Sequence, residues 1–437
     1  MIVLKNLKIV NPVKDFNGIF NIAIKDGIII DIYESELEKK EYKDFQHFDL
    51  KGKVATPSFV DIHVHLRDPG YEYKEDIFSG AEAAKKGGFT DICCMANTNP
   101  VIDNEEVVKY ILKKGKETKI NIYPVAAITK GLKGESLTEF GNLIEAGAIA
   151  LSDDGVDIRN AFLLKTAFEY AKFFNVPILC HCENLNLATG FMRDGKYSTL
   201  AGIMGNPSIS EEINVFRNIK IAEYTGSKVH ICHISSKGSV EIIRFFKNKD
   251  VNVTCEVTPH HLSLTDKDVY ESDYDTNFKM NPPLGTEEDK EILIESLSEG
   301  IIDCVATDHA PHAEHEKLVE FEYAPNGIIG LETAFPVCYQ LVLNNKITLK
   351  DLIYRMTIKP AKIVGIEKGE IEVGAKANIT IIDIELEKVY TKDEIKSKSK
   401  NSPFIGRKFK GWPIMTISNG EIVYDWWYKR LEEELSK

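Results

Sequence analysis

The sequence predicts an α/β protein built on a parallel (β/α)8 barrel, the TIM-barrel class, and three observations carry that prediction. Between residue 58 and about residue 344, short apolar runs rich in Val, Ile, Cys and Ala alternate with amphipathic helical patterns. Eight such pairs can be counted, which is the content of one closed barrel. The polar residues that end the runs lie far apart in the chain, as they do where a barrel assembles a site from several strand ends.

Each expected strand ends in a polar residue, and helical patterns lie between the strands. The strand ends fall, in chain order, at His63–His65, Cys94–Asn97, Ala127–Thr129, Ser152–Asp153, His181, His233, Glu256 and Asp308. The helical patterns include residues 79–87, 104–118, 160–174, 210–226, 239–248 and 287–299. Long connections at 184–209, 260–286 and 309–330 follow strand ends, and residues 308–332 are a candidate substrate lid.

The two ends of the chain predict a second, smaller unit. Residues 1–57 and 365–437 contain short strand patterns with turns, and Asp26-Gly27 and Asn419-Gly420 are hairpin-type dipeptides. We therefore expect one small composite β-sandwich domain built from both termini, with the barrel occupying residues 58–364. The Lys- and Ser-rich stretch from Lys388 to Lys410 is expected to be a solvated connecting loop.

Composition restricts the functional classes. Hydrophobic residues make up 43% and charged residues 28% of the 437 positions, which is typical of a globular protein. The net charge of −13 argues against nucleic acid as a partner, because such binding needs a basic face. The first residues lack a signal-peptide layout, and no apolar run reaches the roughly 20 residues of a membrane span, so we expect a cytoplasmic protein without a membrane partner. The eight cysteines include no CxxC pair and are expected to be buried, reduced thiols.

One pair of histidines, His63 and His65, is the most informative chemical signal. Side chains alternate along a strand, so residues two apart face the same side and can offer two imidazoles to one metal ion. Nitrogen and oxygen donors without thiolate favour Zn²⁺, with Mn²⁺, Co²⁺ or Fe²⁺ as alternatives, and six donors would suit two bridged ions. Taken singly, His181 or His233 is more typical of a hydrogen-bonded core histidine, and Asp153 of a turn. The candidate metal ligands are His63, His65, Asp153, His181, His233 and Asp308.

Several motifs, in order along the chain, closely resemble those of the dihydroorotases, in the cyclic amidohydrolase branch of the metal-dependent amidohydrolases. The match begins at Asp61-Ile-His-Val-His-Leu-Arg-Asp-Pro-Gly70 and ends at Pro325-Asn-Gly-Ile-Ile-Gly-Leu-Glu332. Between them lie Met95-Ala-Asn-Thr-Asn-Pro100, Ser152-Asp-Asp-Gly155, Cys180-His-Cys-Glu183, Glu256-Val-Thr-Pro-His-His-Leu262, Asn281-Pro-Pro-Leu284 and Ala306-Thr-Asp-His-Ala-Pro-His312. The family usually has Pro in place of Ala96 and Arg in place of Gly285. The resemblance covers essentially the whole chain and implies a distorted (β/α)8 barrel with a composite β domain.

The resemblance also implies roles for individual residues. His63 and His65 would bind one Zn²⁺ ion and His181 and His233 a second, with Asp308 as both a ligand and the catalytic general acid–base. Many relatives bridge the ions with a carbamylated lysine, but residues 148–153 include none, so Asp153 is the expected bridge in a site of one or two ions. The expected substrate-binding residues are His65, Arg67, Asn97, Asn281, His312, Asn326 and Gly327.

The reaction that the resemblance implies is the reversible hydrolysis of L-dihydroorotate to N-carbamoyl-L-aspartate in pyrimidine synthesis. Arg67 carries the substrate argument, because a planar guanidinium can hold the carboxylate beside the dihydroorotate ring. A hydantoinase- or allantoinase-like amidohydrolase and a non-catalytic scaffold protein are the alternatives. A homo-oligomer stays open, and association with aspartate carbamoyltransferase is implied by the family alone.

Overall fold

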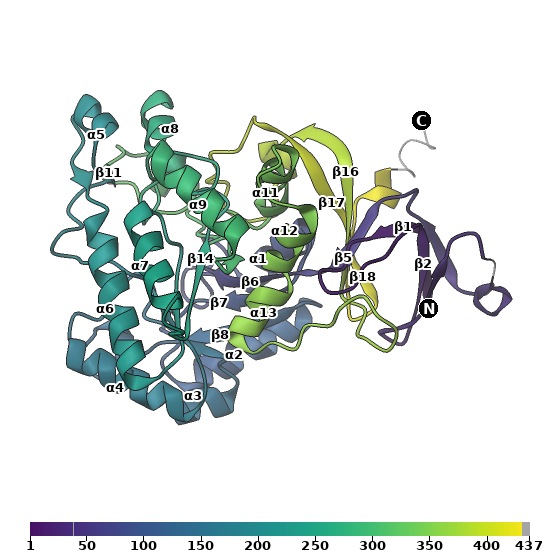
Figure 1. The fold of residues 1–437 in the computed structure, drawn as a ribbon, viewed down its shortest axis with the longest axis horizontal. Helices are drawn as coiled ribbons and strands as arrows, with labels where there is room; N and C mark the ends of the chain where they lie inside the picture. Colours follow the sequence, from purple (N-terminus) through teal and green to yellow (C-terminus); the bar gives the residue numbers. More distant parts are fainter. Residues whose placement is uncertain (38, 431–437) are drawn as a thin grey trace.

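An eight-stranded parallel barrel lies beside an eight-stranded sheet assembled from both ends of the chain (Figure 1). This computed structural model describes residues 1–37 and 39–430. The barrel and its helices occupy the left of Figure 1, and the strands of the terminal sheet stand on the right. The fold class predicted from the alternating apolar and amphipathic segments is confirmed.

The strands of the barrel pair in sequence order, all of them parallel. The ring is closed by a bridge between Val64 and His309, where the His65 N–H donates to the His309 carbonyl at 2.9 Å. Because every strand runs in the same direction, their carboxyl ends open at one mouth. The strands are β6 (Phe59–Val64), β7 (Phe89–Cys94), β8 (Asn121–Ala126), β9 (Ala150–Leu151), β10 (Ile178–Cys180), β13 (Val229–Ile231), β14 (Val253–Val257) and β15 (Cys304–Val305).

Helices surround the barrel, and capping side chains fix where several of them begin. The Asn104 carboxamide accepts hydrogen bonds from the N–H groups of Glu106 and Val107, which satisfies backbone donors that the first turn of α2 leaves free. The barrel helices are α1 (Ile77–Gly87), α2 (Glu105–Glu117), α3 (Phe140–Ala146), α4 (Ala161–Phe173), α6 (Ile209–Thr225), α7 (Lys237–Lys247), α9 (Glu287–Glu299), α11 (Ala334–Leu343), α12 (Leu349–Met356) and α13 (Ile358–Val364).

The long connections predicted after strand ends contain short elements of their own. They follow the carboxyl ends of barrel strands. These elements are β11 (Met192–Arg193), α5 (Lys196–Ala201), β12 (Gly205–Asn206), α8 (Asp266–Glu271), η3 (Thr276–Phe278) and α10 (Glu314–Lys317). A further short helix, η2 (Lys130–Leu132), lies in the shorter connection after β8.

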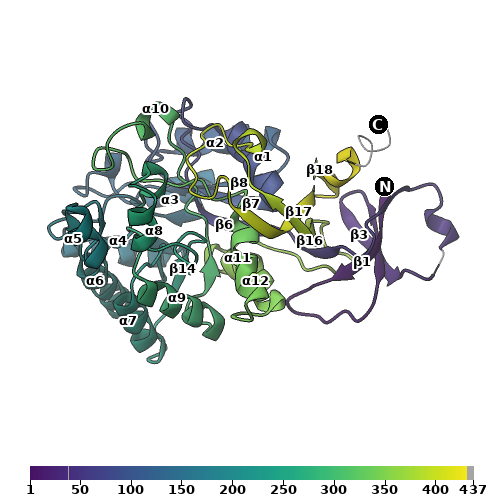
Figure 2. The same ribbon diagram turned by 90° about the horizontal axis from the view of Figure 1, so that it is seen from above.

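The terminal sheet joins the two ends of the chain directly. Strand β5 pairs antiparallel with β16, with Ala55 opposite Ile381, so a strand from residues 1–57 lies beside one from the C-terminal part. Figure 2 shows this sheet set to one side of the barrel. Its strands and short helices are β1 (Ile2–Ile9), β2 (Phe20–Lys25), β3 (Ile28–Glu34), η1 (Lys40–Tyr42), β4 (Gln46–Asp49), β5 (Val54–Pro57), β16 (Ile379–Val389), η4 (Lys392–Glu394), β17 (Lys408–Ser418) and β18 (Glu421–Asp425).

Apolar side chains fill both units. Val60 and Ile62 of β6 pack inside the barrel with Leu179 and Cys232, while Leu4 and Ile414 share the core of the terminal sheet. All eight cysteines are free thiols and buried, as expected for a chain without paired cysteines. In the described ranges, no helix has the length and apolar content needed to cross a membrane.

Candidate metal centre and substrate pocket

The candidate metal centre lies at the mouth of the barrel, where the strands end. His63 is in β6 and His65 follows it, His181 follows β10 directly, His233 lies two residues after β13, and Asp308 lies three after β15. All five side chains are buried, with at most 6% of the residue exposed. The structure therefore brings five of the six predicted ligands into the same place.

Distances among these side chains are short enough for shared ligation. The Nε2 atoms of His63 and His65 lie 3.5 and 3.0 Å from Oδ1 of Asp308. On the other side, Nδ1 of His181 lies 3.0 Å from Nε2 of His233. The donors therefore form two groups. His63 and His65 lie at the end of β6, and His181 and His233 lie just after β10 and β13, which is the arrangement that a two-ion centre requires.

Asp154, and not Asp153, is the carboxylate that joins these two groups. Oδ1 of Asp154 lies 3.3 Å from Nε2 of His63, 3.7 Å from Nε2 of His233 and 3.9 Å from Nδ1 of His181. The prediction of Asp153 as the bridge is wrong. Its carboxylate turns sideways and accepts hydrogen bonds from the backbone N–H groups of Ile128 and Thr129 at 2.8 and 3.0 Å.

The reason for this error is local. The prediction placed the end of the fourth strand at Asp153, but β9 ends at Leu151, and the chain then turns, with the Val156 N–H bonded to the Asp153 carbonyl. Beyond the end of a strand, the two-residue alternation no longer decides which way a side chain points. Asp154 was visible in the Asp-Asp-Gly motif, but that motif does not distinguish the two carboxylates.

The donors present fit one or two divalent metal ions. Among the described residues, Nε2 of His63 and Oδ1 of Asp154 are buried polar atoms without a hydrogen-bond partner. Such orphaned atoms are rare in folded proteins and call for an explanation. A set of imidazoles and carboxylates that contains no thiolate suits Zn²⁺ and similar ions.

Outer carboxylates and an amide hold the imidazoles in position. Glu256 approaches Nδ1 of His63 at 2.7 Å, Asn97 approaches Nδ1 of His65 at 2.8 Å, and Glu183 lies 3.3 Å from Nε2 of His181. Partners of this kind fix ring orientation and tautomer in metal sites. Glu256 and Glu183 were not predicted as site residues. Both lie in the motifs of the family resemblance, and Glu256 stands out as an acidic residue within the apolar strand β14.

The electrostatics of the centre favour ionised carboxylates. Burial alone would raise the pKa of Asp308, but the neighbouring His63 and His65 more than offset it and lower the pKa to about 2. Burial likewise opposes ionisation of Asp154, and the imidazoles, His63 foremost, hold its pKa well below the usual value. The centre therefore combines anionic carboxylates with imidazoles in a water-poor site.

A cavity of about 270 Å³ opens over these donors. It is large enough for a small ring with a carboxylate. Six of the seven expected substrate-binding residues line it, and Gly327 does not. The lining residues used below are His65, Arg67, Asn97, Asp154, Asn281, Asp308, His312 and Asn326.

Gly327 does not line the cavity but lies in close contact with two residues of the neighbouring loop. A Cβ atom at this position would lie 2.4 Å from the Ala310 carbonyl oxygen and 2.6 Å from Cδ2 of His312. Its φ of +158° also strains any other residue. Gly327 therefore lets the two loops that carry Ala310 and Asn326 approach each other closely.

Three residues at the site have backbone angles that non-glycine residues seldom adopt. The φ angles of Arg67, His233 and Asp308 are +60°, +31° and +45°. Such positions cost on the order of 1–3 kcal/mol each and persist where the surroundings enforce them, often at functional sites. The strained backbone at these three positions lowers the stability of the fold, and in return it directs the side chains towards the site.

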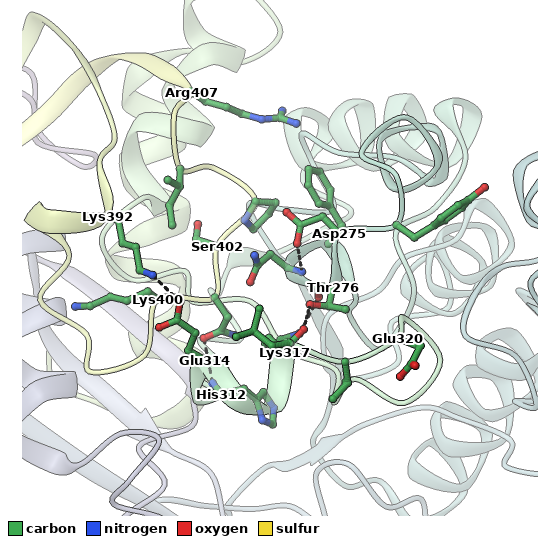
Figure 3. Close-up of a pocket in the computed structure, with 18 residues that line it drawn as sticks. Asp275, Thr276, His312, Glu314, Lys317, Glu320, Lys392, Lys400, Ser402 and Arg407 are labelled. Atoms are coloured by element: carbon green, nitrogen blue, oxygen red, sulfur yellow. Dashed lines mark hydrogen bonds and ion pairs between the residues drawn. The ribbon is translucent and has the colours of Figure 1, made fainter.

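A larger cavity of about 1090 Å³ adjoins the first (Figure 3). His312 lines both cavities. None of the potential metal-binding groups found among the described residues lies in the larger cavity, so the chemistry belongs to the smaller one.

Comparisons with known proteins agree with this geometry. A family model described as "Dihydro-orotase-like" matches residues 52–239, and one described as "Amidohydrolase family" matches residues 294–424. A dihydroorotase of Acetivibrio thermocellus is 47% identical over 96% of this chain and 98% of its own length. A dihydroorotase of Syntrophus aciditrophicus is 46% identical over 97% of this chain and 99% of its own length.

A solved structure extends the likeness to the fold. The L-hydantoinase (dihydropyrimidinase) from Arthrobacter aurescens superimposes with a TM-score of 0.85 over 97% of this chain and 96% of its own, at 24% identity. At that identity the match supports the fold and leaves the substrate open. With relatives above 40% identity over nearly the whole length of the protein, the chain belongs to the dihydroorotase family of the amidohydrolases.

Proposed function

We propose that this protein is a dihydroorotase, which catalyses the reversible hydrolysis of L-dihydroorotate to N-carbamoyl-L-aspartate. The observation that carries the proposal is one small cavity that combines four imidazoles, the carboxylates of Asp154 and Asp308, and the guanidinium of Arg67. The relatives named dihydroorotase over the whole chain support the same substrate.

The donors would hold Zn²⁺ as one or two ions. His63, His65 and Asp308 would hold one, and His181 and His233 the other, with Asp154 shared. Such an ion, when bound, supplies a Lewis acid for the ring carbonyl and lowers the pKa of an attacking water. His63 and His181 are kept in orientation by Glu256 and Glu183, so the chain presents the donors already arranged.

Arg67 would bind the substrate carboxylate. Its Nε donates to the Pro311 carbonyl at 3.2 Å, and its Nη2 lies 3.4 Å from Nε2 of His312. Burial lowers the pKa of Arg67 from its usual value, yet a guanidinium keeps its charge in proteins. Within residues 1–37 and 39–430, no carboxylate lies at ion-pair distance from Arg67, which leaves this charge to a carboxylate of the ligand.

Asp308 would move the proton. It is anionic at neutral pH, so it can take a proton from the attacking water and then give it to the ring nitrogen. That second transfer is needed because an unprotonated amide anion is a very poor leaving group. Asn97 and Asn281, which both line the cavity, would orient the ring.

An assay with three substrates tests the proposal. Protein reconstituted with Zn²⁺ should consume dihydroorotate, followed by its ultraviolet absorbance, far faster than hydantoin or allantoin. A preference for hydantoin or allantoin would assign the protein to another cyclic amidohydrolase activity. No turnover by protein that binds no metal would favour the non-catalytic scaffold.

The proposed reaction places the protein in pyrimidine biosynthesis and in the cytoplasm, where its substrate is made. Association with aspartate carbamoyltransferase, which makes N-carbamoyl-L-aspartate, is part of the proposal through the family resemblance. Co-elution of the two proteins when mixed would support it.

We also propose a homo-oligomer that packs through helices α4, α6 and α7. The outward faces of these helices carry aromatic side chains that are largely exposed, namely Phe162 at 73%, Phe173 at 83%, Phe216 at 47%, Tyr224 at 77% and Phe245 at 50%. Exposed aromatic side chains that gather on neighbouring helices favour an interaction surface. Light scattering should give a multiple of the 49.2 kDa chain mass, and a monomer would contradict the proposal.

A further inference from the structure

A segment of the C-terminal part of the chain reaches across to the substrate pocket. Residues 395–402, here called the strap, connect η4 to β17 and were expected to be part of a solvated loop. That expectation is wrong, because Ser397, Ser399, Asn401 and Ser402 are all at most 4% exposed. The serines and Asn401 are buried because their polar groups find hydrogen-bond partners, whereas Lys396 and Lys398 between them stay exposed.

The first half of the strap is anchored by two buried glutamates. Oε1 of Glu332 accepts hydrogen bonds from the backbone N–H groups of Lys396 and Ser397 at 2.7 and 3.1 Å. Glu75 accepts from the Ser397 hydroxyl and from the Lys398 N–H, the latter at 3.0 Å. Glu75 also lies 3.3 Å from Nε2 of His309, next to Asp308 in the chain.

The second half ends at Asn401, whose side chain joins two loops of the barrel. Oδ1 of Asn401 accepts from the His312 N–H at 3.0 Å. Nδ2 of Asn401 donates to the carbonyl oxygens of Ala310 and Gly327, each at 3.0 Å. The carboxamide is thereby used to nearly its full capacity, with both N–H groups and the oxygen engaged.

The two loops that Asn401 joins carry residues of the substrate pocket. His312 and Asn326 line the smaller cavity, and Nε2 of His312 contacts the Asn326 carbonyl at 2.9 Å. Nη2 of Arg67 lies 3.4 Å from the same His312 nitrogen. The position of His312, and through it that of Arg67, therefore depends on where Asn401 holds the loop backbone.

On its other side the strap borders a cavity. The larger cavity lies there, lined by Lys400, Asn401 and Ser402 and open to solvent. In Figure 3 the strap forms one wall of this cavity and the segment with Asp275 and Thr276 the opposite wall, with His312 below. The three side-chain hydrogen bonds of Asn401 therefore restrain the two loops together with the apolar packing of Phe321 and Ile329.

We propose that Asn401 is a positioning residue for substrate binding, which acts through His312 and the Asn326–Gly327 backbone. The terminal domain would then contribute to the substrate site from about 90 residues beyond His312, as their separation in the chain shows. Asn401 itself does not line the smaller cavity, so its effect is indirect. Only the kinetic test of this inference rests on the proposed dihydroorotase function, because the hydrogen-exchange test needs no substrate.

The experiment compares wild-type protein with N401A, N401D and S399A. N401A removes all three side-chain hydrogen bonds. N401D keeps the volume and the acceptor for the His312 N–H, but its ionised carboxylate donates to neither carbonyl. Ser399 is the matched control, because it lies in the strap, is equally buried, and its hydroxyl donates to the Lys74 carbonyl at 2.6 Å rather than to either loop.

We expect KM for dihydroorotate to rise about ten-fold in N401A, less in N401D, and hardly at all in S399A, with kcat and bound zinc changing little. Hydrogen exchange should show faster exchange of the amides in residues 310–312 and 326–329 in N401A and N401D alone. If N401A does not fold, the KM and the hydrogen exchange of N401D, which has the same shape as the wild-type side chain, decide the role of Asn401.

Two outcomes would overturn the inference. One is a KM for N401A and N401D equal to that of S399A in an active enzyme. The other is unchanged hydrogen exchange in both loops. An inactive but zinc-loaded wild type would instead count against the proposed function, and hydrogen exchange would still decide the role of Asn401.

Discussion

Asp153 and Asp154 are consecutive, yet their carboxylates serve different parts of the structure. Oδ1 of Asp154 lies 3.3 Å from Nε2 of His63 in the metal centre. Oδ1 of Asp153 accepts from the Ile128 N–H at 2.8 Å and fixes the turn after β8. One residue of difference therefore separates a candidate bridging ligand from a structural carboxylate.

Substitution of these two aspartates should have distinct effects. D154N should lose bound zinc and nearly all activity, because an amide is a weak bridge between cations. D153N, the matched control, should keep zinc and most activity while its melting temperature falls, since it leaves buried backbone donors less well paired. Metal content by mass spectrometry, together with thermal unfolding, distinguishes them. Equal zinc loss in both would contradict the assignment of Asp154.

Removal of metal should destabilise the protein reversibly. A ligand that binds only the folded state adds about 4 kcal/mol when its free concentration is a thousand times Kd. Treatment with a chelator should therefore lower the melting temperature, and added Zn²⁺ should restore both the temperature and the activity. D154N should show little response to the chelator. An identical melting curve for treated and untreated wild type would exclude a bound metal.

Loss of Arg67 should affect substrate binding more than metal binding. R67A removes the proposed partner of the substrate carboxylate and should cost roughly 2–5 kcal/mol in kcat/KM. R67K keeps the charge but not the planar pair of donors, so its loss should be intermediate. Zinc content should stay at the wild-type level in both. Unchanged dihydroorotate turnover in R67A would remove the substrate argument.

Glu256 should matter for metal affinity although it is not a ligand. Its two oxygens lie 2.7 Å from Nδ1 of His63 and 3.0 Å from Nε2 of His230. E256Q removes the charge that orients His63, and zinc affinity should fall by about 10- to 100-fold. Asp91 is a buried carboxylate paired with Lys368, so D91N serves as the control and should leave the zinc affinity unchanged. Competition with a zinc-binding dye measures the zinc affinity of each variant. Equal affinities for E256Q and the wild type would refute the role of Glu256 in orienting His63.

His312 should make the protein sensitive to acid. Burial first, then the charges of Arg67 and Lys74, lower its pKa to about 2, so the folded protein keeps it neutral. The unfolded chain takes up a proton near pH 6.5, so the contribution is complete above that pH and declines as pH falls from 6.5 towards 2. Between pH 6.5 and 5 the wild type should lose about 2 kcal/mol more than H312Q in urea unfolding. If the free energy of unfolding fell equally with pH in the wild type and in H312Q, the pKa of His312 would not be lowered in the folded protein.

The sequence was a good guide wherever regular structure decided the geometry. The alternation of apolar runs and helical patterns predicted the eight barrel units. Because parallel strands of one barrel open at one mouth, it also predicted that His63, His65, His181, His233 and Asp308 would meet. It was less useful for second-sphere residues such as Glu256, whose partner His63 lies 193 positions away.

What the sequence alone determined is the barrel and the types of donor at its mouth, since strand periodicity and chain direction are local properties. Only the tertiary structure decided that Asp154 faces the histidines and that Asn401 clamps the substrate loops. Both depend on the way the chain turns after a strand ends and on partners distant in sequence. Such contacts are chosen by the packing of the whole molecule, and no short-range pattern encodes them.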